Sequence, residues 1–255
     1  MKLYTESLPK PGAPALVLLH GWGMSSDIWQ PLLPELSRHY SLTLIDLPGL
    51  GRSPALTEPL TLSSVVDALL SAAPDKASWL GWSLGGQLAL ACAAQAPARI
   101  ERLITVASSP CFVARDDWHC AMDETVFSGF ETALQDQPDK TLTRFMMLQT
   151  QGAEAGKETL KQLRELQKSL SHAQLLNTLQ LLRLDCREQL AQLSMPVLQI
   201  FGERDQLVPQ AAAQACAALT GRFAQLYSGA GHLPFLSHPD LFFADLNRFM
   251  ETSVG

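Results

Sequence analysis

Charged residues are scarce in this chain, and basic residues are fewer than acidic ones. Only 17% of the 255 residues are charged, and the formal net charge is −6. Wholesale binding to nucleic acid or to an anionic membrane surface requires an excess of basic residues, so both are disfavoured. Hydrophobic residues make up 47% of the chain, which is enough for one large core without disorder. We therefore expect a single compact domain that is monomeric.

Cysteines are also few, and they form no recognisable pairs. The five cysteines are odd in number and nowhere form a C-x-x-C motif. A disulfide framework and a zinc site are therefore not indicated, and we expect reduced, mostly buried thiols. Nothing else in the sequence calls for a metal or an organic cofactor. The cysteines are Cys92, Cys111, Cys120, Cys186 and Cys216.

Long hydrophobic runs are missing as well. The first apolar run, residues 16–19, has only the length of a strand, and Glu6 and three prolines precede it. Neither a signal peptide nor a transmembrane span fits this pattern, so we expect a cytoplasmic protein.

Short apolar runs alternate with helical patterns through most of the chain. Continuous apolar strands separated by helices predict an α/β fold, with a mostly parallel central sheet and helices on both of its faces. Between residues 113 and 187, helix formers replace the strand-like runs, notably at 158–171 and 175–184, which predicts an inserted helical lid. The core then comprises residues 1–112 and 188–255. The expected strands include 16–19, 42–45, 79–80, 103–106, 197–201 and 224–227, and the expected helices include 86–96, 210–219 and 240–251.

A serine flanked by glycines stands between one of these strands and the helix that follows it. The motif is Gly81-Trp82-Ser83-Leu84-Gly85, which in this setting is typical of a nucleophile elbow. Such a turn is so sharp that the serine adopts a strained backbone conformation, which glycine neighbours allow because they lack a Cβ. The turn pushes Ser83 Oγ outward, and we interpret the chain as a serine hydrolase.

An alcohol is a poor nucleophile at its ordinary pKa, so Ser83 needs a histidine base and a carboxylate that orients this base. In α/β-hydrolases the acid follows the strand after the lid, and the histidine follows the last strand. Asp205 in Gly202-Glu203-Arg204-Asp205 and His232 in Gly229-Ala230-Gly231-His232 occupy these places. Glu203 remains the alternative acid, and Asp46 is better explained by the turn Asp46-Leu47-Pro48-Gly49.

The other five histidines fit the role of base less well. His20 precedes a glycine at the end of a strand, where it shapes a loop, and His238 stands at a helix start before Pro239. The remaining three, His39, His119 and His172, lack the context of a strand followed by glycines.

Negative charge that develops on a substrate carbonyl needs fixed hydrogen-bond donors, each worth about 3 kcal/mol. The Leu84 backbone N–H lies at a helix N-terminus, whose partial positive charge adds to its effect. The Trp22 backbone N–H is the expected second donor, because His20-Gly21-Trp22-Gly23 follows a strand. The run Gly49-Leu50-Gly51-Arg52-Ser53-Pro54 begins like a dinucleotide fingerprint but has proline at the third glycine position, so we interpret it as a tight turn.

Basic residues gather in the expected lid although the protein as a whole is acidic. Lys157, Lys161, Arg164 and Lys168 are spaced by four, three and four residues, so one helix would carry them on one face. Such a face is an ordinary solvated surface or, beside the entrance to the site, a field that steers an acidic macromolecule. The nearby run Phe145-Met146-Met147-Leu148 suits the lining of an alkyl pocket or the packing of the lid on the core.

Four motifs together are informative: Leu19-His20-Gly21-Trp22-Gly23, Asp46-Leu47-Pro48-Gly49, Trp79-Leu80-Gly81-Trp82-Ser83-Leu84-Gly85-Gly86 and Val106-Ala107-Ser108-Ser109-Pro110-Cys111-Phe112. In combination they resemble one family, the pimeloyl-[acyl-carrier protein] methyl ester esterases of biotin synthesis. The first three occur in looser form throughout the α/β-hydrolases, whereas the last motif and the tryptophans on both sides of the site are more specific. The resemblance covers essentially the whole chain and implies an α/β-hydrolase fold.

The resemblance also implies roles for individual residues. Ser83, Asp205 and His232 would form a catalytic triad that releases methanol from the carrier-bound pimeloyl ester. Basic lid residues would bind the acidic acyl-carrier protein. Three of the four are lysine at positions where arginine is typical of the family, and lysine lacks the bidentate geometry of arginine. The implied carrier contacts are Lys140, Arg144, Lys157 and Lys161, and the implied substrate contacts are Trp22, Ser83, Leu84, Phe145, Met146, Met147, Leu148 and Gln149.

Other functions remain open on the residues alone. The same three residues on the same fold serve a general short-chain carboxylesterase or a carbon-carbon bond hydrolase, because a fold does not fix the substrate. A receptor without catalytic activity is a further alternative, which the complete set of nucleophile, base, acid and oxyanion loop disfavours.

Overall fold

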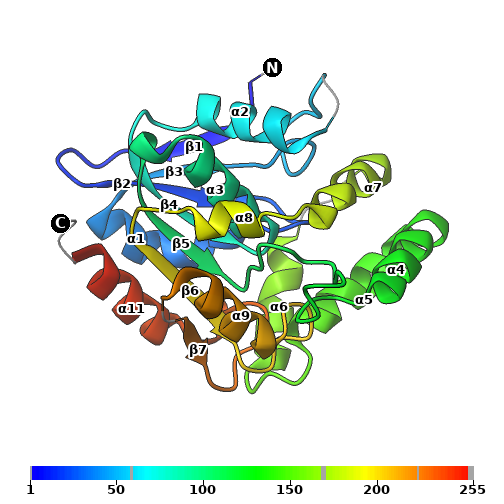
Figure 1. The fold of residues 1–255 in the computed structure, drawn as a ribbon. Coiled ribbons are helices and arrows are strands. Elements are labelled where there is room, and N and C mark those ends of the chain that lie inside the picture. Colours follow the sequence, from blue (N-terminus) through cyan, green and yellow to red (C-terminus); the bar gives the residue numbers. More distant parts are fainter. Residues whose placement is uncertain (1, 58–59, 168–170, 223, 252–255) are drawn as a thin grey trace.

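The apolar runs of the sequence form one central sheet, shown in the computed structural model of Figure 1. The structure describes residues 2–57, 60–167, 171–222 and 224–251. Within them the strand order is β1-β3-β2-β4-β5-β6-β7, and all neighbouring strands are parallel except β1 and β3. The predicted mostly parallel α/β sheet is therefore confirmed. The strands are β1 (Thr5–Leu8), β2 (Ala15–Leu19), β3 (Ser41–Ile45), β4 (Ala77–Trp82), β5 (Ile100–Val106), β6 (Val197–Gly202) and β7 (Gln225–Tyr227).

The sequence pattern misses the edge strand β1. This strand contains Glu6 and Ser7 and is partly exposed along its length. It pairs antiparallel with β3, from Thr5 opposite Ile45 to Leu8 opposite Leu42. An edge strand has fewer neighbours than a central strand, so it needs no continuous apolar run and gives a weak sequence signal.

Side chains that alternate along each central strand divide the interior into two cores. In β2, Val17 and Leu19 enter one core while Leu16 and Leu18 enter the other, as the twofold period of a strand requires. Helices cover both faces of the sheet, as predicted (Figure 1). The first core is covered by α2 (Leu62–Ala72), α3 (Leu84–Gln95), α8 (Arg187–Ala191) and α9 (Gln210–Thr220), and the second by the 3-10 helix η1 (Ser26–Leu32), α1 (Leu33–His39), α10 (Pro234–Ser237) and α11 (Pro239–Glu251).

Helices replace strands between residues 113 and 187, where the lid is expected. They lie together beside the sheet in Figure 1, and α4 packs on both α5 and α7. That this segment acts as a separate lid stays a prediction. The helices are α4 (Glu124–Asp136), α5 (Pro138–Thr150), α6 (Gly156–Leu166), α7 (His172–Leu179) and the 3-10 helix η3 (Gln180–Arg183). Besides η1 and η3, the described chain contains one further 3-10 helix, η2 (Pro97–Arg99).

The stretch of helix formers over residues 158–171 does not form one continuous helix. Helix α6 ends at Leu166, and Gln167 has an extended backbone with φ −73° and ψ 129°. Ser171, a residue type that favours the position before a helix, precedes the separate helix α7. Lys157, Lys161 and Arg164 therefore share α6, whereas Lys168, the fourth residue of the expected basic face, lies outside the described residues.

No helix in the described ranges combines the length and the apolar character that a membrane crossing requires.

Close packing of helix α3 on strand β2 depends on Gly85. A Cβ added at this position would lie 2.5 Å from the carbonyl oxygens of both Leu19 and His20. Backbone atoms cannot swing away as a side chain does, so the helix approaches the strand this closely only because residue 85 is glycine. The approach places the N-terminus of α3 beside the loop that follows β2.

Gly85→Ala is expected to lower the free energy of unfolding by about 1–3 kcal/mol or more, because the new methyl group overpacks a rigid backbone contact. Gly129→Ala is the matched control, since Gly129 lies within α4 and a Cβ there meets no atom within 4 Å. This second change should raise stability by about 1 kcal/mol through helix propensity. Urea unfolding of both variants measures the difference, and equal effects would contradict the packing described above.

Candidate active site

Ser83 occupies the turn between strand β4 and helix α3 in a strained conformation. Its φ of 54° and ψ of −121° lie outside the regions that L-residues prefer, at a cost on the order of 1–3 kcal/mol. The Ser83 carbonyl accepts the N–H groups of Gly86 and Gln87, and the Ser83 N–H donates to the Val106 carbonyl at 2.9 Å. A Cβ at Gly81 would collide with the backbone of Gly85. The elbow geometry expected from the motif is therefore present.

Three residues from separate loops meet beside this elbow. His232 Nδ1 lies 2.7 Å from Asp205 Oδ2, and His232 Nε2 lies 2.9 Å from Ser83 Oγ. A carboxylate only accepts, so the imidazole donates from Nδ1 and its Nε2 accepts the Ser83 hydroxyl proton. The side chains of His232 and Asp205 are only 1% and 0% exposed, so water hardly competes for these hydrogen bonds.

Asp205 rather than Glu203 contacts the histidine. The second oxygen of Asp205, Oδ1, accepts the N–H groups of Leu207 at 2.8 Å and Val208 at 3.0 Å, which fixes the carboxylate in place. Glu203 instead binds the Gly229 N–H at 2.8 Å and the Ser228 hydroxyl at 2.9 Å, and these hydrogen bonds lower its pKa. Glu203 therefore binds backbone and side-chain groups of residues 228–232, called the histidine loop below, and does not contact the His232 ring.

The other histidines lie away from Ser83 Oγ. His39 pairs with Glu35 at 3.3 Å and His172 with Asp139 at 3.1 Å, both at the surface. His238 contacts Ser237 Oγ at 2.8 Å. His119 is exposed, and His20 is fully buried in the loop after β2.

The two expected oxyanion donors come from the elbow itself and from the loop that follows β2. Within the described residues, the backbone N–H groups of Trp22 and Leu84 have no hydrogen-bond acceptor. Leu84 is the first residue of α3, where the helix dipole is positive. A Cβ at Gly21 would lie 3.2 Å from Ser83 Cβ. The residue 20–23 loop, called the oxyanion loop below, is therefore packed directly against Ser83.

An apolar pocket of about 60 Å³ lies beside the oxyanion loop. Trp22 forms one wall, with its ring centroid 5.7 Å from that of Phe130 and 5.1 Å from that of Phe145. A narrow pocket at Ser83 shares Phe112 and Leu182 with it. An acyl chain attached to Ser83 therefore has apolar surroundings within reach. The remaining lining residues of the apolar pocket are Met122, Val126, Phe127, Leu148, Leu179 and Leu207.

The expected substrate contacts in α5 do not form one continuous lining. Phe145 and Leu148 line the apolar pocket, but Met146 packs into the second core and Met147 is 50% exposed. Consecutive helical residues point in different directions, so a run of four cannot share one surface. Gln149 is buried and its carbonyl accepts the His232 N–H at 2.9 Å, while its side-chain amide has no hydrogen-bond partner in the described part of the chain.

A groove of about 450 Å³ runs between α4 and α5 and adjoins the apolar pocket. The groove and the pocket share Val126, Phe130 and Leu148. Lys140 and Arg144 line the groove and are exposed. The groove therefore leads from a positively charged surface toward the wall formed by Trp22.

The basic residues of α5 and α6 differ from the other cations of this segment. Lys157 and Lys161 are exposed on α6. Among the residues described, neither they nor Lys140 and Arg144 form an ion pair. By contrast, each of the two arginines near the end of the segment binds two carboxylates: Arg183 pairs with Glu124 and Glu131, and Arg187 with Asp117 and Asp185.

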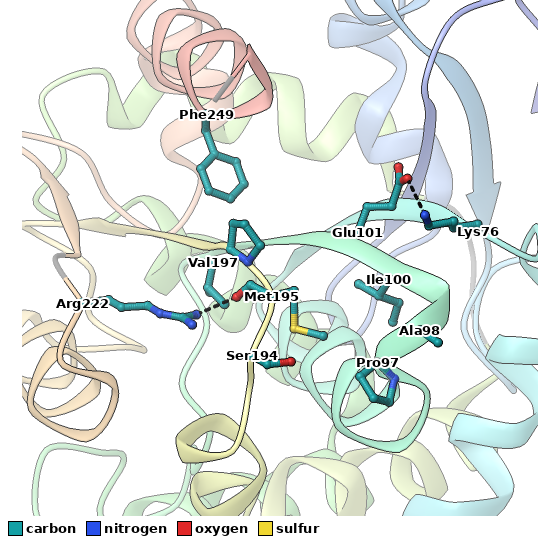
Figure 2. A pocket seen from close by; sticks show the side chains of 11 residues that line it. Lys76, Pro97, Ala98, Ile100, Glu101, Ser194, Met195, Val197, Arg222 and Phe249 are labelled. Atoms are coloured by element: carbon teal, nitrogen blue, oxygen red, sulfur yellow. Dashed lines mark hydrogen bonds and ion pairs between the residues drawn. The ribbon is translucent and has the colours of Figure 1, made fainter. Parts of the chain in front are cut away.

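A larger cavity of about 750 Å³ lies at the opposite edge of the sheet, where β5 and β6 begin (Figure 2). There Lys76 pairs with Glu101 at 3.3 Å, and the Arg222 guanidinium donates to the Met195 carbonyl at 2.9 Å. None of its described lining residues is a histidine. Size alone therefore does not locate the chemistry, which follows the carboxyl ends of the strands.

Two further hydrogen bonds in the site were not predicted by any sequence motif. The Trp82 indole N–H donates to the His232 carbonyl at 2.8 Å, and the Ser108 hydroxyl donates to the Ser83 carbonyl at 2.7 Å. The Trp22 indole N–H likewise donates to the Leu175 carbonyl of α7 at 3.2 Å. Only the resemblance of the flanking motifs pointed to Trp82 and to the segment around Ser108.

Asp205→Asn is expected to lower kcat for p-nitrophenyl butyrate by about 10⁴, because an amide favours the wrong tautomer of His232. Glu203→Gln is the matched control, since it keeps the shape of the neighbouring carboxylate that holds Ser228 and Gly229. Its kcat should fall by less than about tenfold, as a hydrogen bond at the surface is worth only about 1 kcal/mol. Steady-state hydrolysis by both variants compares the two acids, and a larger loss from Glu203→Gln would reverse their assignment.

Comparisons with known proteins agree with this geometry. A family model for the alpha/beta hydrolase fold matches residues 14–239. The chain resembles a hydrolase structure from Pseudomonas aeruginosa with a TM-score of 0.80 and 25% identity, covering 97% of this chain and 94% of that one. An esterase from Exiguobacterium antarcticum superposes with a TM-score of 0.85 at 20% identity, covering 98% and 96% of the two chains, which supports the fold.

Curated relatives are more similar in sequence. The pimeloyl-[acyl-carrier protein] methyl ester esterase of Edwardsiella ictaluri is 42% identical over 92% of this chain and 93% of its own. The protein of the same name from Proteus mirabilis is 43% identical over 94% of both chains. With this identity over nearly its full length, the chain belongs to the family of pimeloyl-[acyl-carrier protein] methyl ester esterases within the α/β-hydrolase fold.

Proposed function

We propose that this protein is a serine carboxylesterase that hydrolyses the methyl ester of pimeloyl-[acyl-carrier protein] in biotin biosynthesis, releasing methanol. The observation that carries the chemistry is the unbroken contact from Asp205 through His232 to Ser83 Oγ. The names of the curated relatives support the substrate. Residues of the chain suffice for the steps that follow.

Acylation begins when Ser83 Oγ attacks the ester carbonyl carbon and passes its proton to His232 Nε2. The carbonyl oxygen becomes an oxyanion, which the backbone N–H groups of Trp22 and Leu84 stabilise. When the tetrahedral intermediate collapses, the bond between the carbonyl carbon and the methoxy oxygen breaks. His232 returns its proton to that oxygen, so methanol leaves and the acyl group remains on Ser83.

Deacylation repeats these steps with water as the nucleophile. The oxygen of a water molecule attacks the acyl carbon while His232 Nε2 takes a proton from that water. The backbone N–H groups of Trp22 and Leu84 stabilise the second oxyanion. The proton then returns to Ser83 Oγ, which frees the pimeloyl carboxylate. Throughout, Asp205 keeps the imidazole oriented and stabilises its charged form.

The apolar pocket and the groove suit an acyl chain that is tethered to a large carrier. The pocket reaches Trp22 of the oxyanion loop, and the groove extends from the pocket to Lys140 and Arg144 at the surface. A carrier that stays at the surface limits how deeply its acyl chain enters. The distal ester then meets Ser83, while the thioester next to the carrier remains outside.

Exposed cations that form no ion pair within the described ranges suit an acidic carrier protein. Lys140 and Arg144 on α5 and Lys157 and Lys161 on α6 are free to pair with carboxylates of a partner. Lysine provides charge without a planar fork, so such a surface steers the carrier more than it fixes one geometry. A general short-chain carboxylesterase is the competing function, because the apolar pocket is small.

Charge reversal separates these two functions. The double change Lys157→Glu and Lys161→Glu should lower kcat/KM for the carrier-bound methyl ester by about tenfold, because the two glutamates repel the acidic partner that the lysines attract. The same variant should hydrolyse free dimethyl pimelate at a rate within about twofold of the unchanged protein. Lys10→Glu, at an exposed site in the turn after β1, is the matched control and should leave both rates unchanged.

Methanol and carrier thiol are measured separately in the same assays. The proposed function predicts methanol as the main product, and added salt should reduce the carrier-bound rate selectively. Equal losses on both esters, or preferential release of the carrier thiol, would reject the carrier-directed function.

A further inference from the structure

His20 is a buried histidine whose two ring nitrogens both have defined partners. The side chain is 0% exposed. Its Nε2 accepts the Leu47 backbone N–H at 2.9 Å, and its Nδ1 lies 2.8 Å from the Gly21 carbonyl oxygen. A nitrogen that accepts carries no proton, so the ring is neutral with its proton on Nδ1, which donates to Gly21.

The Gly21 carbonyl belongs to the same peptide unit as the Trp22 N–H. In a trans peptide the C=O and N–H bonds lie in one plane and point in opposite directions, and the described chain contains no cis peptide. A donor that holds the carbonyl on one side therefore directs the N–H to the other side. His20 is such a donor, and the peptide packs against Ser83, as the close approach of Gly21 shows.

We propose that His20 is a positioning residue that aims the Trp22 N–H at the oxyanion by holding the Gly21 carbonyl through Nδ1–H. The inference rests on the proposed ester hydrolysis at Ser83 and adds to it a residue that touches neither substrate nor nucleophile. It gives a function to the histidine at the start of His20-Gly21-Trp22-Gly23, a residue that the catalytic steps above do not use.

The imidazole is itself anchored through Leu47, because the preceding residue is fixed on several sides. Asp46 is 0% exposed and accepts the Ser26 N–H at 2.7 Å, the Arg52 N–H at 2.8 Å and the Arg52 Nε–H at 3.0 Å. Burial opposes ionisation of Asp46, whereas the hydrogen bonds from Arg52 and Ser26 favour it.

The protonation state of His20 agrees with this function. Burial lowers its pKa, against the opposing attraction of Asp46. The ring therefore stays neutral at pH 7 and keeps Nε2 available to the Leu47 N–H. A second proton, on Nε2, would place the Nε2–H group against the Leu47 N–H and break the hydrogen bond that anchors the ring.

Two amide substitutions separate the hydrogen bonds of His20. Asparagine places its NH₂ group near the position of Nδ1, so His20→Asn retains the donor to Gly21 and loses the acceptor for Leu47. Glutamine places its carbonyl near the position of Nε2, so His20→Gln retains the acceptor and loses the donor to Gly21. Both remove the imidazole, which makes each variant a control for the other.

His20→Gln should lower kcat for p-nitrophenyl butyrate by about tenfold and weaken a trifluoromethyl ketone inhibitor by a similar factor, because both depend on the oxyanion donors. Its KM should stay within about twofold. His20→Asn should lose less than about threefold in kcat. His39→Gln, at an exposed site, should leave kcat unchanged. Equal losses in the Gln and Asn variants, or a rise in KM alone, would overturn the proposal.

A measurement on the unchanged protein covers the case in which either variant fails to fold. Nitrogen-15 NMR of the His20 ring should show a protonated Nδ1 and an unprotonated Nε2 at pH 7, and the opposite tautomer or a doubly protonated ring would overturn the proposal. The variant Ser83→Ala distinguishes a failure of the proposed function from a failure of the inference about His20. Hydrolysis that survives in Ser83→Ala would refute the proposed chemistry, whereas hydrolysis that depends on Ser83 but ignores His20→Gln would refute only the inference.

Discussion

The hydrogen bond between Ser83 Oγ and His232 Nε2, 2.9 Å long, is the contact on which the proposed chemistry depends. It joins residues 149 positions apart, so it exists only because parallel strands end at the same edge of the sheet. Ser83 follows β4, Asp205 follows β6 and His232 follows β7. The strained turn at Ser83 is held by packing of α3 on the sheet, so the stability of the fold supplies the energy stored in the site.

The helical segment 113–187 is connected to this site by several hydrogen bonds. The His232 N–H donates to the Gln149 carbonyl, the Glu154 N–H donates to the Gly229 carbonyl at 3.0 Å, and the Trp22 indole binds the Leu175 carbonyl. The segment therefore fixes both the histidine loop and the oxyanion loop while it provides one wall of the apolar pocket. A change in these helices is therefore expected to move the loops that carry His232 and Trp22 through these hydrogen bonds.

Much of the fold was predictable because central strands are buried on both faces and leave continuous apolar runs. Ser83, Asp205 and His232 were identifiable by strand-end context and chain order, and the structure brings them into contact. The sequence pattern did not predict strand β1, because an edge strand is half polar. It did not predict the end of α6 either, because helix formers continue beyond Leu166. The hydrogen bonds of His20, Trp22 and Trp82 could not be derived from spacing, since they join loops whose separation is set only by the folded sheet.

A crystal structure of the covalent adduct formed with a fluorophosphonate tests the convergence of these groups most directly. The account predicts phosphorus bonded to Ser83 Oγ, with its phosphoryl oxygen within about 3 Å of the Trp22 and Leu84 backbone nitrogens. Phosphorus on a different residue, or a phosphoryl oxygen turned away from both nitrogens, would contradict it.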